Sequence, residues 1–155
     1  MQITRSQMSV SARAELGIVA GFVGSVMMAL SVVVVNSLNF IQVPWFSEVG
    51  YMFGSSGPSY EVAIGGLAWF IGMGVLGGVV FAFVFTEYSV NKGLGLAAIG
   101  FILTALTMTL ETIPPFSGTL ISMGLGSFLA LFVPLAVVYC IWGICVGFMA
   151  RRYLK

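Results

Sequence analysis

The six basic and five acidic side chains of this chain all lie outside four long apolar runs, and this pattern constrains the fold more than any other feature. A membrane-spanning helix takes roughly 20 apolar residues, or ~17 at the short end. Each run is long enough for one such helix. The first run also leaves room for a loop, and the last leaves room for a segment before its helix. The runs cover residues 16–47, 62–86, 93–110 and 112–150.

The apolar runs predict an all-α integral membrane protein in which four transmembrane helices form one bundle. Only 7% of the residues are charged, against about 25% in ordinary soluble domains, so a soluble fold is excluded. We expect a single transmembrane domain over residues 1–155. Its helices are predicted near 16–38, 62–85, 93–110 and 128–150.

The charged residues predict the orientation of these helices. If the helices alternate in direction, one side of the membrane carries every basic residue: Arg5, Arg13, Lys92, Arg151, Arg152 and Lys155. The connections on the opposite side contain only acidic charges: Glu48, Glu61 and Glu111. Cytoplasmic segments of membrane proteins are rich in Lys and Arg. Both termini are therefore predicted to be cytoplasmic, in the plasma membrane of a prokaryote.

The basic residues after the fourth run are interpreted as charges that set orientation, with recognition of lipid headgroups as the alternative. A net charge of +1 gives no indication of nucleic acid binding, and none is expected. The first apolar run exceeds the roughly 7–15 residues of a signal-peptide core. Residues 16–38 are therefore expected to form a retained helix.

The two halves of the chain resemble each other. The sequence VPWFS at 43–47 follows the first run, and IPPFS at 113–117 follows the third. Near the ends of the second and fourth runs, GVVFAF at 78–83 matches GICVGF at 143–148. The matches occur in the same order, which favours a tandem duplication of a two-helix hairpin, related by an axis along the membrane normal. The alternative is four unrelated helices that share a proline turn.

Small residues at four-residue spacing predict where the helices approach one another. Apolar side chains gain nothing by leaving lipid, so membrane helices pack through close backbone contact. The ridges indicate a tight bundle, whose contacts lie within the chain or with another subunit. The ridge residues are Gly17, Gly21 and Ser25 in the first run, Gly74, Gly78 and Ala82 in the second, Gly143 and Gly147 in the fourth and, more weakly, Gly100 and Thr104 in the third.

No pattern in the sequence indicates catalysis or a cofactor. The chain has no histidine, so it has no imidazole to act as a general base or to bind haem, copper or iron. Cys140 and Cys145 lie about 140° apart around a helix and therefore on different faces. The nine methionines are interpreted as packing residues. We expect no enzyme activity, no metal site and no cofactor, with membrane lipids as the bound molecules.

The strongest candidate for a polar membrane site is Glu111, at the outer end of the third run. Thr104 and Thr107 share its helix face, which would suit the entry of a cation or proton. The alternative is an interfacial carboxylate, with the threonines bonded to their own helix. The aromatic-rich segment 39–60 is expected to lie along the lipid–water boundary, with a binding lid as the alternative.

The sequence AGFVGSVMM at 20–28, together with the glycine pairs Gly74/Gly78 and Gly143/Gly147, resembles a group of small glycine-rich four-helix membrane proteins of unknown function that are frequent in archaea. Members often have a histidine within the second and fourth helices. This chain has none, and Tyr139 occupies the fourth-helix position. The resemblance implies a four-helix fold and no activity.

These features predict a non-catalytic accessory or structural subunit of a larger integral membrane complex of a respiratory or energy-transducing kind. The alternative is a small homo-oligomeric transporter or channel, with Glu111 and the threonine face along its path. A dual-topology multidrug exporter fits poorly, because the charge bias is strong and no carboxylate lies within a span.

Overall fold

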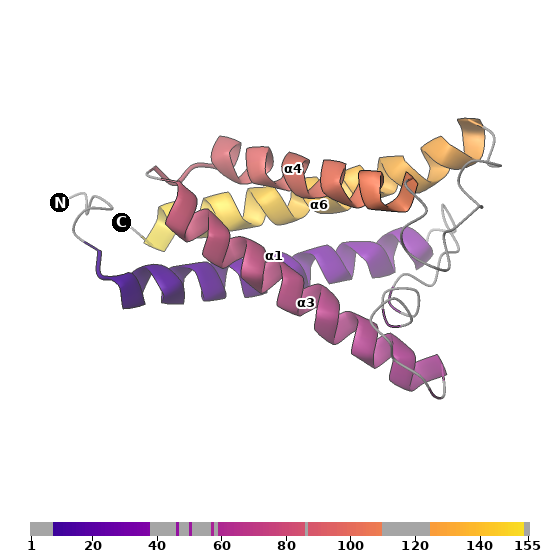
Figure 1. Ribbon diagram of the computed structural model, residues 1–155, viewed down its shortest axis with the longest axis horizontal. Coiled ribbons are helices and arrows are strands. Elements are labelled where there is room, and N and C mark those ends of the chain that lie inside the picture. Colours follow the sequence, from indigo (N-terminus) through magenta and orange to yellow (C-terminus); the bar gives the residue numbers. More distant parts are fainter. Residues whose placement is uncertain are drawn as a thin grey trace.

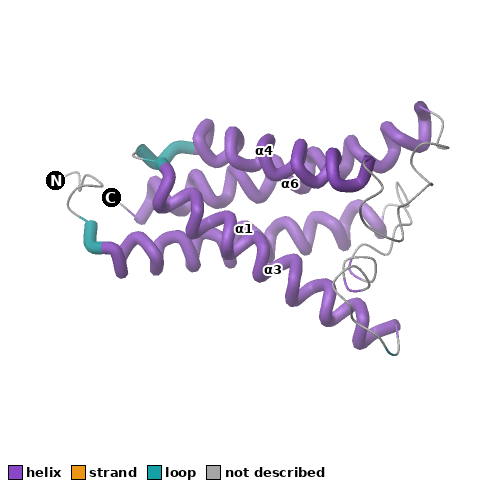
Figure 2. The backbone as a smooth tube through the Cα atoms, in the orientation of Figure 1, coloured by secondary structure: helices purple, strands orange, loops and turns teal. Residues whose placement is uncertain are grey.

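The computed structural model describes residues 8–37, 46, 50, 57, 59–85, 87–109 and 125–153. Over these residues the protein is all-helical and has no strand. Figure 1 shows the four helices: α1 (Val10–Ser37), α3 (Ser59–Val84), α4 (Val90–Thr109) and α6 (Leu125–Tyr153). The all-α, four-helix prediction is therefore confirmed. The described part of the connection between α3 and α4 is short (Figure 2).

The described helices begin earlier than the apolar runs suggested, and polar residues cap two of them, α1 and α4. α1 begins at Val10, where the Ser9 hydroxyl accepts a hydrogen bond from the Ala12 backbone N–H at 3.1 Å. α4 begins at Val90, where the Ser89 hydroxyl accepts one from the Lys92 N–H at 3.3 Å. The start of a helix thus depends on which side chain satisfies its first amides, whereas the apolar run marks only the part suited to lipid.

Three of the helices are long and apolar enough to cross a membrane, which supports an integral membrane protein. The fourth is a shorter apolar helix over Val90–Leu106 within α4. α4 as a whole has 20 residues, which at 1.5 Å per residue gives a length of about 30 Å, similar to a hydrocarbon core. α6 runs from Leu125 through Pro134 to the two arginines in its last turn.

The helices are arranged in the order α3, α1, α6, α4. α1 packs extensively along both α3 and α6, and α4 packs along α6, whereas the backbone of α3 comes close to the backbones of α4 and α6 at few points. Figure 1 shows α3 diverging from the other helices toward its first residue, while the start of α1 and the end of α6 lie together at the opposite end. The bundle is therefore an open row in which α3 and α4 form the two edges.

The buried core lies along the middle of this row, between α1 and α6. Leu16 and Ala20 of α1 and Val146 of α6 are almost fully buried there. At the end of α3, the Phe81 ring packs against Tyr88, whose hydroxyl donates a 2.8 Å hydrogen bond to the Ala82 carbonyl. This bond ties the connection after α3 to the helix that precedes it.

Candidate functional site

The first hairpin is held together by direct contact between the backbones of α1 and α3. A methyl group added at Gly17 would lie 2.6 Å from the Val79 Cα, and one at Gly21 would lie 2.7 Å from the Gly74 carbonyl oxygen. A methyl group at Gly78 would overlap the Gly17 carbonyl. Any side chain at these positions would therefore push the two helices apart. Ala82, one turn after Gly78, is fully buried.

The second hairpin uses the same kind of contact between α4 and α6. A methyl group at Gly143 would lie 2.7 Å from the Ala97 Cβ, and one at Gly147 would lie 2.7 Å from the Val90 Cα. Gly93 touches the Gly143 carbonyl. On α4 this backbone contact is made by Gly93 and Ala97, about two turns and one turn before the expected Gly100. Gly100 faces the Tyr139 ring: a methyl group added at Gly100 would lie 3.0 Å from the nearest carbon of that ring.

Trp142 of α6 fills the space between the two hairpins. Its ring is 6% exposed and lies against three glycines, Gly24 of α1 and Gly74 and Gly77 of α3. A methyl group at Gly77 would come within 2.8 Å of the ring. The indole is therefore the main link between α6 and α3, whose backbones remain apart.

Ser25 and Trp142 bring two polar groups together beside Gly74. The fully buried Ser25 hydroxyl donates to the Gly21 carbonyl at 2.7 Å, and the Ile71 carbonyl lies 3.4 Å away. A methyl group at Gly74 would overlap this hydroxyl and lie 3.2 Å from Trp142 Nε1. The indole N–H has no hydrogen-bond partner within the part of the chain that the structure describes.

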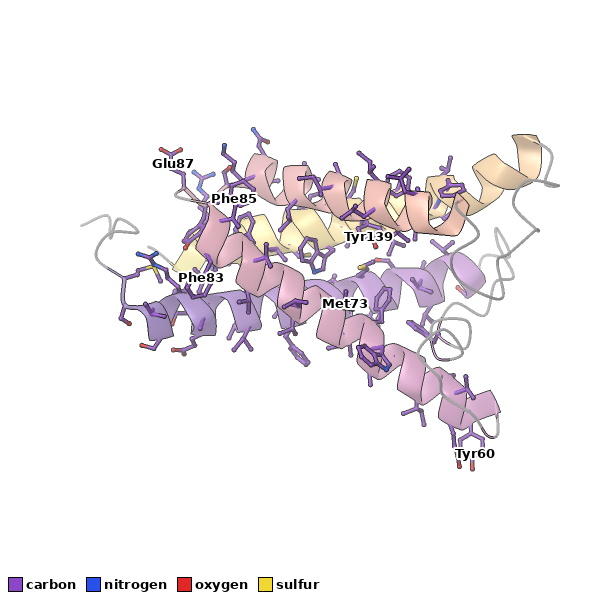
Figure 3. All side chains as sticks on the ribbon, viewed as in Figure 1. Tyr60, Met73, Phe83, Phe85, Glu87 and Tyr139 are labelled. Carbon is purple, nitrogen blue, oxygen red and sulfur yellow. The ribbon has the colours of Figure 1, made fainter. Side chains whose placement is uncertain are left out.

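A second polar contact joins α4 to α6. The Thr104 hydroxyl lies 3.0 Å from the Gly100 carbonyl and 2.6 Å from the Tyr139 hydroxyl. The Tyr139 ring also packs edge-on against Phe101. Figure 3 shows Tyr139 part-way along α6, in the middle portion of the bundle. Thr104 thus faces the neighbouring helix, so its hydroxyl is not directed toward lipid.

Together these groups form a polar row across the bundle, defined by Thr104, Tyr139, Trp142 and Ser25 together with the Ile71 carbonyl. Each helix contributes at least one member. All of the groups are neutral hydrogen-bond donors or acceptors, which in a membrane act chiefly to connect helices. Among the described residues no group of three His, Cys, Asp or Glu side chains is close enough to hold a metal ion.

Several of the residues singled out in the sequence fall outside this row. Glu111 and most of segment 39–60 lie outside the described residues, and of Thr107 only the helical backbone is described. Within that segment, Phe46 packs edge-on against Phe70 of α3 at 5.7 Å. Cys140 is exposed and Cys145 half-buried, and both are free thiols.

Sequence reasoning missed Trp142, whose ring contacts two other helices, α1 and α3. The sequence signal for this contact was the pair of adjacent glycines at 77 and 78. Gly78 alone is enough for the close approach to α1. Gly77 makes room for the indole. The four-residue spacing of Gly93 and Ala97 was likewise a usable signal for the α4 contact. No protein-family model, curated protein or solved structure matches the chain.

Proposed function

We propose that this protein is a non-catalytic subunit of a larger integral membrane assembly, of a respiratory or energy-transducing kind. Four helices cross the membrane in this proposal, with both termini on the cytoplasmic side. The main support is the open row of helices, because among α1, α3, α4 and α6 the edge helices α3 and α4 each pack extensively along only one other helix. A subunit whose role is to pack against others needs free helix surfaces of this kind.

The glycines on the two edge helices indicate where a further helix would pack. At Gly72 of α3 and Gly95 of α4, no atom of the described residues lies within 4 Å of an added methyl group. Other glycines of the same helices, such as Gly74 and Gly93, are sites of close approach to a neighbouring helix. In membranes, small residues at a surface permit close helix approach. A partner helix would therefore meet α3 at Gly72 and α4 at Gly95.

The test is to extract the protein in mild detergent and identify what is bound to it in fixed stoichiometry. Larger membrane subunits should accompany the wild type and be lost from Gly72→Leu and Gly95→Leu. The unfolding temperature of the isolated chain should not change in either variant, because none of the described residues contacts those positions. Gly74→Leu is the matched control, since it should destabilise the chain itself. A wild type that purifies only as a homo-oligomer would contradict the proposal.

The second candidate function is a small homo-oligomeric transporter or channel. It is favoured by the polar row, which brings hydroxyl groups from three helices into the bundle. Glu111, which follows α4 in the sequence, would be the coupling carboxylate. Proton- or cation-driven flux in reconstituted vesicles, lost in Glu111→Gln, would establish this function. We expect Glu111→Gln to be tolerated, because an interfacial amide keeps the shape of the carboxylate.

We also infer that the two hairpins arose by duplication. The contact of Gly17 with Gly78 in the first hairpin resembles that of Gly93 with Gly143 in the second. Ser25 and Thr104 each lie within hydrogen-bond distance of the carbonyl four residues earlier, on Gly21 and Gly100. Ser25 and Thr104 are in the register that aligns Gly21 with Gly100, whereas Gly93 lies three residues before the position that corresponds to Gly17.

A further inference from the structure

Two basic side chains at the end of the bundle near the termini are positioned by aromatic rings. The Lys92 Nζ lies 5.8 Å from the centre of the Phe85 ring, and the Arg152 guanidinium lies 6.0 Å from that of Phe148. Cations within about 6 Å of a ring centre are attracted to its face. Figure 3 places Phe85 at this end of the bundle. Both charges are therefore held close to the helices although both residues are exposed.

The packing of α4 against α6 brings these charges to a similar depth. Gly147 of α6 touches Ser89 and Val90 at the start of α4, so Phe148 lies near the level of the α3–α4 connection. Side chains in a helix lean toward its N-terminus. Because the two helices run in opposite directions, Lys92 leans out of the membrane and Arg152 leans back toward it. Both charges then lie at the level where an apolar bundle of this length meets lipid headgroups.

These cations are not neutralised by the described part of the protein. No carboxylate of the described residues forms an ion pair with Lys92, Arg151 or Arg152. The acidic residues described at this end are Glu15 on α1 and Glu87 on the connection, and both are exposed. Charges at headgroup depth that lack a carboxylate partner are complementary to an anion at the same depth. In a membrane that anion is a lipid phosphate.

We propose that Lys92 and Arg152, with Arg151 beside them, form a binding surface for the phosphate group of an acidic phospholipid. The guanidinium provides paired donors to phosphate oxygens, and the ammonium adds a second positive charge. Each basic residue next to a membrane surface strengthens the binding of acidic lipids about fivefold. This interaction is separate from the proposed subunit role and from the orientation of the helices, which any basic residue at this end would support.

The test compares lipid binding to purified protein by native mass spectrometry and thermal unfolding. The probes are phosphatidylglycerol and phosphatidylcholine with identical acyl chains. Phosphatidylglycerol should bind more tightly and raise the unfolding temperature more. Lys92→Gln and Arg152→Gln should each weaken its binding about fivefold, and the double variant should bind the two lipids equally. Lys92→Arg keeps the charge and should retain the preference, and Glu61→Gln, at the opposite end, should leave it unchanged.

Three results would overturn the proposal. The first is equal binding of the two lipids by the wild type. The second is an undiminished preference in the double variant. The third is equal stabilisation by inorganic phosphate, which would indicate a site for soluble anions. If the glutamine variants fail to fold, a salt titration of the wild type still tests the proposal. Its preference for phosphatidylglycerol should decline as salt is raised from about 0.05 to about 0.5 M. A preference that does not depend on salt would contradict an electrostatic site.

Discussion

The Tyr139 hydroxyl of α6 lies 2.6 Å from the Thr104 hydroxyl of α4, the shortest of the described hydrogen bonds between helices. Thr104 is also within 3.0 Å of the Gly100 carbonyl of its own helix. When Thr104 donates to that carbonyl, its oxygen can accept the Tyr139 proton. Thr104 thereby joins a hydrogen bond within α4 to a hydrogen bond between α4 and α6.

Tyr139→Phe should lower the free energy of unfolding by about 0.6 kcal/mol and by no more than about 1.7 kcal/mol, the range for interhelical hydrogen bonds in membranes. Thr104→Val should cost a similar amount, and the double variant should cost little more than either one. Unfolding in mixed micelles measures all three. Tyr153→Phe, at an exposed position, is the control. Additive effects of the two substitutions would show that the hydroxyls do not interact.

Gly78→Leu and Gly21→Leu should each destabilise the first hairpin by about 1–3 kcal/mol or more. A leucine at either position would overlap the backbone of the facing helix, so the helices must separate. Leu30→Ile, at a position that is 54% exposed, should be nearly neutral. Thermal unfolding of the purified variants measures the difference. Unchanged stability in both glycine variants would mean that these faces meet lipid and not each other.

Trp142→Phe should cost much less stability than Trp142→Ala. The alanine variant leaves a cavity among Gly24, Gly74 and Gly77, at a cost of about 3–5 kcal/mol. The phenylalanine variant keeps most of the packing and removes an N–H that has no partner among the described residues. The comparison is made by denaturant unfolding followed by circular dichroism. If phenylalanine costs as much as alanine, the indole N–H makes a hydrogen bond in the membrane.

Single cysteines placed in a background lacking Cys140 and Cys145 test the orientation. A membrane-impermeant thiol reagent added to sealed cells should label cysteine at positions 55 and 117 but not at position 6. The reason is that basic residues keep the first segment on the cytoplasmic side. Broken cells, in which all three positions should react, are the control. Labelling at position 6 in sealed cells would contradict the predicted topology.

The number and type of the helices could be predicted from the sequence, but their boundaries could not be predicted from apolarity alone. The first helix continues past Leu16 to Val10, through Arg13 and Glu15, because the Ser9 hydroxyl is available as a cap. The capping serines are visible in the sequence. Apolar length is only a measure of suitability for lipid, and it carries no information on hydrogen bonding at a helix end.

The candidate site could be predicted only in part. The glycines of the ridges were identifiable because a four-residue spacing places them on one face of a helix, whichever helix they meet. Trp142 could not be assigned from its own residue type, because an indole suits lipid, an interface or a core equally well. Its position depends on where Gly24 and Gly77 of two other helices leave space.

The sequence by itself determined that this protein is a set of apolar helices with positive charge gathered toward one side. The reason is that the cost of placing a charge in hydrocarbon depends on the residue and hardly on its neighbours. Only the tertiary structure decided that the helices form an open row, with α3 and α4 apart. Which glycine meets which backbone depends on the relative rotation of two helices, and that rotation is set by contacts between residues far apart in the chain.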